Sequence, residues 1–169
     1  QKKFLELENI LDGIYGVGEL SKTILDKISS YGELLSSYIF YEITRFNNLK
    51  SKYIDARKII FTKKSKGNNL IIDFDKTSKK LDVVLNKKNG SLLIFPGFIA
   101  SSYDKKTTTL GRGGSDFSAS ILANIVNAKK LDIWTDVSGM YTANPKIVKQ
   151  AKPISELSYE EAMELSYFG

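Results

Sequence analysis

A short apolar run at residues 91–95 constrains the fold of this chain more than any other feature. The run, Ser-Leu-Leu-Ile-Phe, shows no alternation of polar and apolar residues, and Pro96-Gly97 ends it. Such a run is typical of a strand with both faces buried, as in a parallel sheet covered by helices. Residues 131–135, Leu-Asp-Ile-Trp-Thr, predict a second buried strand.

Amphipathic patterns predict helices around these strands. Apolar residues recur at spacings of three and four through residues 35–46, which predicts a helix that begins near Glu33 and ends at Asn47-Asn48. Residues 24–28 carry a shorter stripe of the same kind. Residues 52–54 predict a short strand, whereas residues 62–69 and 101–109 are polar and predict loops.

Three further helices are predicted in the second half of the chain. One covers residues 74–85 and is closed by Asn89-Gly90, a second covers 117–126, and a third follows Ser158. Ser158 and Glu161 have the spacing of a capping box. This alternation of helices and strands predicts an α/β domain with a mainly parallel sheet.

Composition narrows the chemistry that the chain can perform. Its 169 residues, 42% of them apolar, fit one domain with a core. The absence of cysteine and histidine excludes disulfides, zinc thiolate sites, thiol catalysis and a Ser-His-Asp triad. A bound metal would have to be a hard cation held by oxygen, such as Mg²⁺ beside phosphates.

Charge and hydropathy make some partners improbable. Lys and Arg number 25 against 19 Asp and Glu, for a net charge of +6, but the lysines occur as scattered pairs. We therefore expect a solvated surface and no nucleic-acid partner. No run of about 18 apolar residues and no N-terminal segment of signal-peptide type are present, so we expect no membrane partner and a cytoplasmic location.

The segment at residues 107–116, Thr-Thr-Thr-Leu-Gly-Arg-Gly-Gly-Ser-Asp, carries the strongest chemical signal. Three glycines in four residues allow close approach of a ligand, and the following helix would offer its N-terminus to an anion. Arg112 adds a planar fork for a carboxylate or phosphate. Ser115 and Asp116 stand where they could cap the helix, and a plain glycine-rich turn explains the pattern about as well.

A second candidate position is Asp136, at the carboxyl end of the strand predicted at residues 131–135. Open α/β sheets bind ligands at this edge, so the carboxylate could orient Mg²⁺ or a nucleotide. Capping of the next turn is an equally good interpretation.

Three long motifs, in order and in register, resemble the aspartate kinase family. They are T-T-T-L-G-R-G-G-S-D-F-S-A, I-W-T-D-V-S-G-M-Y-T-A-N-P-K-I-V and P-I-S-E-L-S-Y-E-E-A-M-E-L-S-Y-F-G. The sequences of these motifs are most similar to those in the kinase part of bifunctional aspartokinase–homoserine dehydrogenases. The resemblance implies a three-layer α/β/α sandwich of the amino-acid-kinase type. It also implies ATP-dependent phosphorylation of the side-chain carboxylate of L-aspartate to 4-phospho-L-aspartate, the first step of lysine, threonine, methionine and isoleucine biosynthesis.

The same resemblance implies roles for individual residues. Arg112 would bind the α-carboxylate of aspartate, Glu33 its α-ammonium, and Phe98 and Ser115 would line the pocket. Asp116 would be the catalytic-site aspartate that orients a catalytic lysine, so Arg112 and Asp116 are the expected catalytic pair. ATP, with Mg²⁺, would contact Thr135, Asp136, Tyr141 and Lys146, and no separate protein metal site is expected.

Two departures from the family pattern qualify these expectations. The usual D-P-R reads Asn144-Pro145-Lys146 here, which keeps a positive charge but loses the bidentate fork. The family's opening K-F-G-G-T-S strand and its regulatory domains have no counterpart in residues 1–169. We therefore expect an internal piece of the catalytic domain, inactive by itself, from a homo-oligomeric parent.

Two other functions fit parts of the same pattern. One is another amino-acid kinase, acting on glutamate or uridylate; the other is an inactive amino-acid-binding module of the same fold. The pair Glu33 and Arg112 favours an α-amino acid over a nucleotide acceptor.

Overall fold

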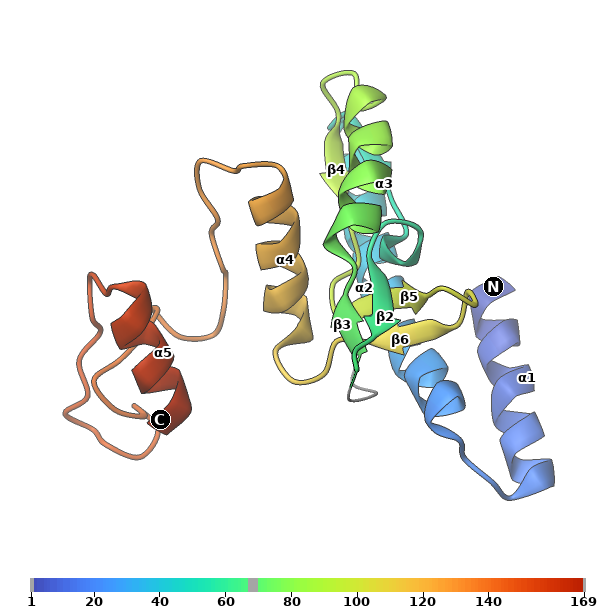
Figure 1. Ribbon diagram of the computed structural model, residues 1–169, viewed down its shortest axis with the longest axis horizontal. Coiled ribbons are helices and arrows are strands. Elements are labelled where there is room, and N and C mark those ends of the chain that lie inside the picture. Colours follow the sequence, from blue (N-terminus) through green and yellow to red (C-terminus); the bar gives the residue numbers. More distant parts are fainter. Residues whose placement is uncertain (1, 67–69, 169) are drawn as a thin grey trace. The chain divides into compact units, whose positions relative to one another are not determined.

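The computed structural model describes residues 2–66 and 70–168, which fall into two units, Gln1–Leu131 and Asp132–Gly169 (Figure 1). The first unit contains helices α1 (Lys2–Val17), α2 (Lys22–Phe46), α3 (Phe74–Asn86) and α4 (Gly114–Ile125), with a 3-10 turn, η1 (Ala56–Lys58). Its strands are β1 (Ser51–Tyr53), β2 (Phe61–Lys64), β3 (Leu70–Ile72), β4 (Leu92–Ile94), β5 (Ile99–Ser102) and β6 (Thr107–Thr109). The second unit contains α5 (Tyr159–Phe168).

Helix α2 is longer than the sequence pattern predicted. It begins at Lys22, where the Ser21 hydroxyl accepts a hydrogen bond from the Ile24 N–H, and it continues through Gly32. The predicted start near Glu33 is therefore wrong, because the two apolar stripes belong to one helix. The predicted end is confirmed, with Asn47 as the C-cap. Glu33 consequently lies in the middle of a long helix.

The described strands form two sheets, one parallel and one mixed. Strands β1 and β4 pair in parallel, and a second sheet has the order β3-β2-β5-β6. In that sheet β2 and β5 are parallel, while β2–β3 and β5–β6 are antiparallel. The two-stranded sheet is therefore parallel, as predicted, whereas the four-stranded sheet is mixed.

Two predicted loops are in fact partly strands. Residues 61–64 and 70–72 form one antiparallel pair, and residues 99–102 and 107–109 form another. Their threonine, serine and lysine side chains give a polar sequence, which is compatible with antiparallel strands that keep one face toward water. Residues 67–69 of the first predicted loop lie outside the described residues.

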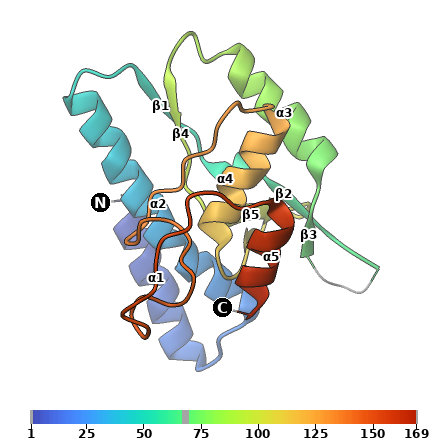
Figure 2. The same cartoon turned by 90° about the vertical axis from the view of Figure 1, so that its left-hand side faces the viewer.

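Helices cover both faces of the strands in the first unit. Helix α2 packs on β1 and β6, α3 on β2, and α4 on β5. Figure 2 shows α2 on one side of β1 and β4, with α3 and α4 on the other. This arrangement confirms the predicted α/β class. The buried core consists of Leu34, Ala56, Ile60, Ile72, Ile99, Ala100 and Ile121.

Helices α3, α4 and α5 agree with the helices predicted from the sequence, except for details at their ends. Helices α3 and α4 are confirmed, but the C-cap of α3 is Lys87, and Asn89-Gly90 form the left-handed turn that follows. The capping box of α5 is confirmed, because the Ser158 N–H donates to Glu161 and the Glu161 N–H donates to the Ser158 hydroxyl. Residues 131–135 are not a strand, since no described segment pairs with them.

Candidate functional site

The glycine-rich segment joins β6 to the N-terminus of α4. Gly113 is the N-cap of α4, in the left-handed conformation with φ 67°, and no side chain caps the helix. The capping role considered for Ser115 and Asp116 is therefore wrong; both lie in the first turn. An uncapped first turn leaves N–H groups and a partial positive charge available to an anion.

Close packing at Gly114 fixes the position of this helix start. A Cβ atom built on Gly114 would lie 2.7 Å from the Phe98 ring, and one on Gly97 would lie 3.0 Å from the Ser115 Cα. The Phe98 N–H donates to the Ser118 hydroxyl at 2.9 Å, and the Phe98 carbonyl accepts from the Leu110 N–H at 2.8 Å. The turn that follows β4 is thus held directly against α4.

Phe98 itself has an unusual backbone. Its φ is +66°, which is uncommon for a residue other than glycine and is often found where function requires a particular geometry. Its half-buried ring packs against the core cluster. Phe98 therefore forms a rigid wall beside the first turn of α4.

Glu33, on α2, contacts the first turn of α4. The Ser115 hydroxyl donates to the Glu33 Oε1 across 3.2 Å, which joins α4 to the middle of α2. Glu33 is half-buried and also lines a cavity of about 540 Å³ between α2 and β4. The structure thus brings three of the predicted substrate residues together: Glu33, Phe98 and Ser115.

Arg112 and Asp116 flank this group and are both exposed. Among the described residues, none forms a hydrogen bond or ion pair with the Arg112 guanidinium or the Asp116 carboxylate. Both charged groups are therefore available to a ligand, one on each side of Gly113 and Gly114. A negative charge in the first turn of a helix, such as that of Asp116, is also favoured by the helix dipole.

In the second unit, three of the four predicted nucleotide residues contact one another. The Thr135 hydroxyl donates to the Asp136 Oδ1 at 3.1 Å, and the Lys146 Nζ lies 3.5 Å from the Asp136 Oδ2. The hydrogen bond from Thr135 and the charge of Lys146 lower the pKa of the Asp136 carboxyl group. Since both members of the ion pair are exposed, the pair is weak and does not fix the Lys146 side chain in place.

Asn144, one of the departures from the family pattern, has a clear local role. Its side-chain oxygen accepts a hydrogen bond from the Lys146 N–H at 3.0 Å, which closes a tight turn. An asparagine or an aspartate can make this bond equally well. The change at position 144 therefore preserves the turn that presents Lys146.

Tyr141, the fourth predicted nucleotide residue, lines a cavity of about 320 Å³ within the second unit. Its backbone pairs with Pro153 in an isolated antiparallel bridge. The other lining residues are mostly small or apolar, namely Val137, Gly139, Met140, Thr142, Ala143, Asn144, Pro145 and Leu165. Such a lining suits a flat aromatic group.

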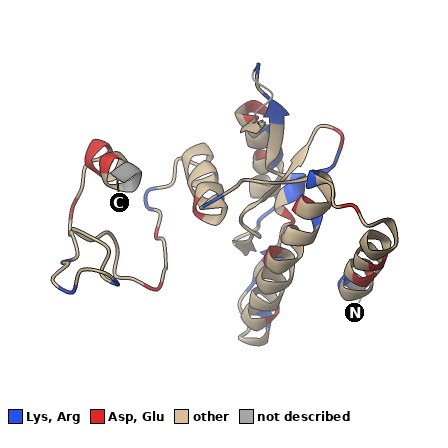
Figure 3. Cartoon of the chain, turned by 90° about the horizontal axis from the view of Figure 1, so that it is seen from below, with Lys and Arg blue, Asp and Glu red and all other residues tan. Residues whose placement is uncertain are grey.

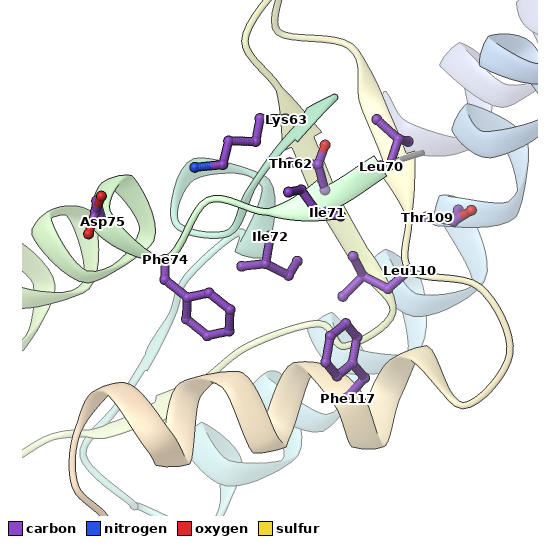
Figure 4. Close-up of a pocket in the computed structure, with 10 residues that line it drawn as sticks. All are labelled: Thr62, Lys63, Leu70, Ile71, Ile72, Phe74, Asp75, Thr109, Leu110 and Phe117. Carbon is purple, nitrogen blue, oxygen red and sulfur yellow. The ribbon is translucent and has the colours of Figure 1, made fainter. Parts of the chain in front are cut away.

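A different cavity in the first unit has a volume of about 560 Å³ and is lined by residues of β2, β3, α3, α4 and the end of β6. Figure 4 shows Ile72, Phe74, Leu110 and Phe117 projecting into it. None of the predicted site residues lines this cavity. Sequence reasoning also assigned no role to Asp26, which accepts a hydrogen bond from Thr109; the run of three threonines was the signal available for finding it.

Charged side chains of both signs occur throughout the described residues (Figure 3). Lys and Arg are spread over many elements, with Asp and Glu among them (Figure 3). Within the described ranges, no three His, Cys, Asp or Glu residues gather as a metal cluster. No helix in the part of the chain that the structure describes is long and apolar enough to cross a membrane.

Comparison with known proteins defines the class. The model of the amino acid kinase family matches residues 5–169, and the chain belongs to that family. Among curated relatives, the lysine-sensitive aspartokinase 3 of Escherichia coli is 37% identical over 172 residues, covering 97% of this chain and 38% of the relative. The chloroplastic bifunctional aspartokinase/homoserine dehydrogenase 2 of Arabidopsis thaliana is 37% identical over 163 residues, covering 96% of this chain and 18% of the relative.

A solved structure agrees with this assignment. E. coli aspartokinase III in complex with aspartate and ADP superposes with a TM-score of 0.85 at 37% identity, covering 97% of this chain and 38% of that one. The predicted resemblance to aspartokinases and the predicted amino-acid-kinase fold are therefore confirmed. The chain spans well under half the length of these relatives.

Proposed function

We propose that this chain contributes the aspartate-binding and ATP-binding residues of an aspartate kinase. The reaction transfers the γ-phosphoryl group of ATP to the side-chain carboxylate of L-aspartate and yields 4-phospho-L-aspartate and ADP. The observation that carries the proposal is the contact between Ser115 and Glu33, which places a carboxylate beside the anion-binding start of α4. The aspartate and ADP named for the related E. coli structure are the acceptor substrate and the nucleotide product of this reaction, which supports the proposal.

The first unit would bind the amino acid. Arg112 and the N–H groups of the first turn of α4 favour the α-carboxylate, while Glu33 favours the α-ammonium. The Ser115 hydroxyl, already bonded to Glu33, would hold that carboxylate in place. Phe98 would exclude water from one side of the bound amino acid. A site with opposite charges in these positions is complementary to a zwitterion and leaves the side-chain carboxylate of aspartate free to react.

The second unit would bind the nucleotide as its Mg²⁺ complex. Tyr141 and the small cavity beside it would accept the base, and Thr135, Asp136 and Lys146 would serve the polar part of the nucleotide. With one carboxylate in this group, the protein offers few oxygen ligands, so Mg²⁺ fits as an ion carried mainly by the phosphates. When bound there, the ion would neutralise charge on the phosphate oxygens.

Catalysis in such a site needs positioning and charge stabilisation rather than covalent participation by the protein. Arg112 would fix aspartate by its α-carboxylate, so that only the other carboxylate can attack. Lys146 would counter the negative charge of the phosphates. Asp116, whose carboxylate is exposed at the start of α4, would hold and orient a lysine ammonium group near the transferred phosphoryl group.

Acceptor specificity separates this proposal from the alternatives. A coupled assay of ADP release, with the protein at its natural length and MgATP, would compare L-aspartate, L-glutamate and uridylate. We expect turnover with L-aspartate alone. Turnover with glutamate or uridylate would favour another amino-acid kinase, and binding of aspartate without turnover would favour an inactive binding module.

A further inference from the structure

The three consecutive threonines of β6 are each tied to a different element. The Arg57 guanidinium donates to the Thr107 hydroxyl at 3.3 Å, and the Thr108 and Thr62 hydroxyls lie 3.2 Å apart. The Thr109 hydroxyl donates to the Asp26 Oδ1 on α2 at 2.8 Å. Figure 4 shows Thr109 beside this helix, at the point where β6 passes into the glycine-rich loop.

Helix α2 therefore holds the two ends of that loop. Asp26 binds Thr109, immediately before the loop, and Glu33 binds Ser115, immediately after it. Asp26 and Glu33 are seven residues apart, which is about two helical turns or about 10.5 Å along one face. A rigid helix of this kind sets the distance between the two ends.

The loop between these ends has two backbone hydrogen bonds, from the Leu110 N–H to the Phe98 carbonyl and from the Gly114 N–H to the Gly111 carbonyl. Gly111 and Gly113 both have left-handed backbones, with φ of 76° and 67°. Glycine has more backbone freedom than any other residue, so a loop that relies on two of them is easily deformed. Arg112 stands between them, and no described residue forms a hydrogen bond or ion pair with its side chain. Where Arg112 points therefore depends on how firmly the ends are held.

Asp26 is well suited to hold one end. It is 8% exposed, and a hydrogen bond from a hydroxyl to a buried carboxylate is stronger than one between neutral groups. The same helix also carries Glu33, so a shift of Thr109 away from Asp26 would change the position of Arg112 relative to Glu33.

We infer that Asp26, acting through Thr109, is a positioning residue that sets the distance between Arg112 and Glu33 and hence the affinity for the amino acid. The inference rests on the proposed function, since it assigns Arg112 and Glu33 to the two charged ends of aspartate. Asp26 touches neither substrate in this scheme.

The test compares Thr109→Val, Thr109→Ser and Thr108→Val in the protein at its natural length. Valine has the shape of threonine without the hydroxyl, so Thr109→Val should raise the KM for aspartate about tenfold, equivalent to about 1.4 kcal/mol. The KM for ATP and the kcat at saturating aspartate should stay near their wild-type values. Thr109→Ser retains the hydroxyl, so its KM for aspartate should equal that of the wild-type protein.

Thr108→Val is the matched control, because it also removes a hydrogen-bonded hydroxyl from β6, but one that is bonded to β2 instead of α2. It should lower the melting temperature without changing the KM for aspartate. An equal rise in KM for both valine variants, or no rise for Thr109→Val, would overturn the inference.

A second measurement covers Asp26 directly. Asp26→Ala and Asp26→Ala/Thr109→Val should have the same KM for aspartate, since the two residues act through one bond; additive effects would count against the inference. If the wild-type protein neither binds nor phosphorylates aspartate, the proposed function fails. If it does and Thr109→Val behaves as wild type, only the positioning role fails.

Discussion

The Ser115 hydroxyl donates to the Glu33 carboxylate across 3.2 Å, although 82 positions of sequence separate the two residues. The bond joins the middle of α2 to the uncapped start of α4. It places a negative side chain next to a region that favours anions, and Arg112 is three residues away along the chain. This pairing of opposite charges underlies the proposed recognition of a zwitterion.

Replacing Arg112 with alanine should weaken aspartate binding far more than ATP binding. Loss of one partner of a charged, hydrogen-bonded contact in a binding site costs roughly 2–5 kcal/mol. The KM for aspartate should rise accordingly, while the KM for ATP changes little. Arg45→Ala is the matched control, because Arg45 is an exposed arginine paired with Glu42 on α2. A larger change in the ATP constant than in the aspartate constant would contradict the role given to Arg112.

Glu33→Gln should affect only ligands that carry an α-ammonium group. The substitution keeps the shape and a hydrogen-bond acceptor for Ser115 but removes the negative charge. Binding of L-aspartate, measured by calorimetry, should weaken at least about tenfold, in line with the value of a charge-assisted hydrogen bond. Succinate lacks the ammonium group, so Glu33→Gln should not weaken its binding. Equal losses for the two ligands would mean that Glu33 does not recognise the ammonium.

Asp136→Asn should weaken nucleotide binding and leave the protein folded. Trp134 is the one tryptophan of the chain, is exposed and adjoins Thr135, so its fluorescence can report the binding of ADP. Glu156→Gln also neutralises an exposed carboxylate in the same unit, outside the Thr135–Asp136–Lys146 group, and serves as the control for altered charge. Unchanged ADP affinity in Asp136→Asn would restrict Asp136 to a local structural role.

The stabilising effect of the contacts around Asp136 should depend on pH. The pKa of Asp136 is lowered by the Thr135 hydroxyl and by Lys146, so the contacts favour the charged form. Their stabilising effect is complete above the ordinary aspartate pKa, about pH 4, and is lost as the pH falls through the lowered value. NMR titration of the carboxyl carbon should show that Thr135→Val moves the pKa upward. No movement would mean that the hydroxyl does not stabilise the carboxylate.

Gly114→Ala should destabilise the first unit. The added Cβ would lie 2.7 Å from the Phe98 ring, so the ring or α4 must move, at a cost of about 1–3 kcal/mol in the free energy of unfolding. Gly32→Ala is the matched control, since Gly32 lies within α2 with no atom within 4 Å of the added group. This change should stabilise the protein by about 0.5–1 kcal/mol, measured by urea denaturation. Equal effects of the two substitutions would contradict the packing described around Phe98.

Regular patterns predicted the local structure well, whereas long-range geometry was predicted only through family resemblance. The periodicity of α3 and the Ser158–Glu161 spacing are local signals, and both were confirmed. Strands β5 and β6 were missed because their serines and threonines form hydrogen bonds within the fold that polarity alone does not reveal. Residues 131–135 read as a strand from apolarity, but a strand also requires a partner.

The contacts within the candidate site could not be predicted from local sequence either. Helix propensity places Glu33 and Ser115 on different elements, and nothing in their local sequence indicates that they touch. The positive φ of Phe98 likewise has no local signal, because it results from packing of the turn against Gly114. The position of Lys146 could have been anticipated in part, since an Asn-Pro pair favours the start of a turn.

The most direct test of the proposed recognition of aspartate is the identity of the carboxylate that is phosphorylated. Hydroxylamine traps an acyl phosphate as a hydroxamate, and the α- and β-hydroxamates of aspartate can be separated chromatographically. If Arg112 holds the α-carboxylate, the protein at its natural length with MgATP and L-aspartate should yield the β-hydroxamate alone. Formation of the α-hydroxamate, or of no hydroxamate while ATP and aspartate are both bound, would contradict the proposed site.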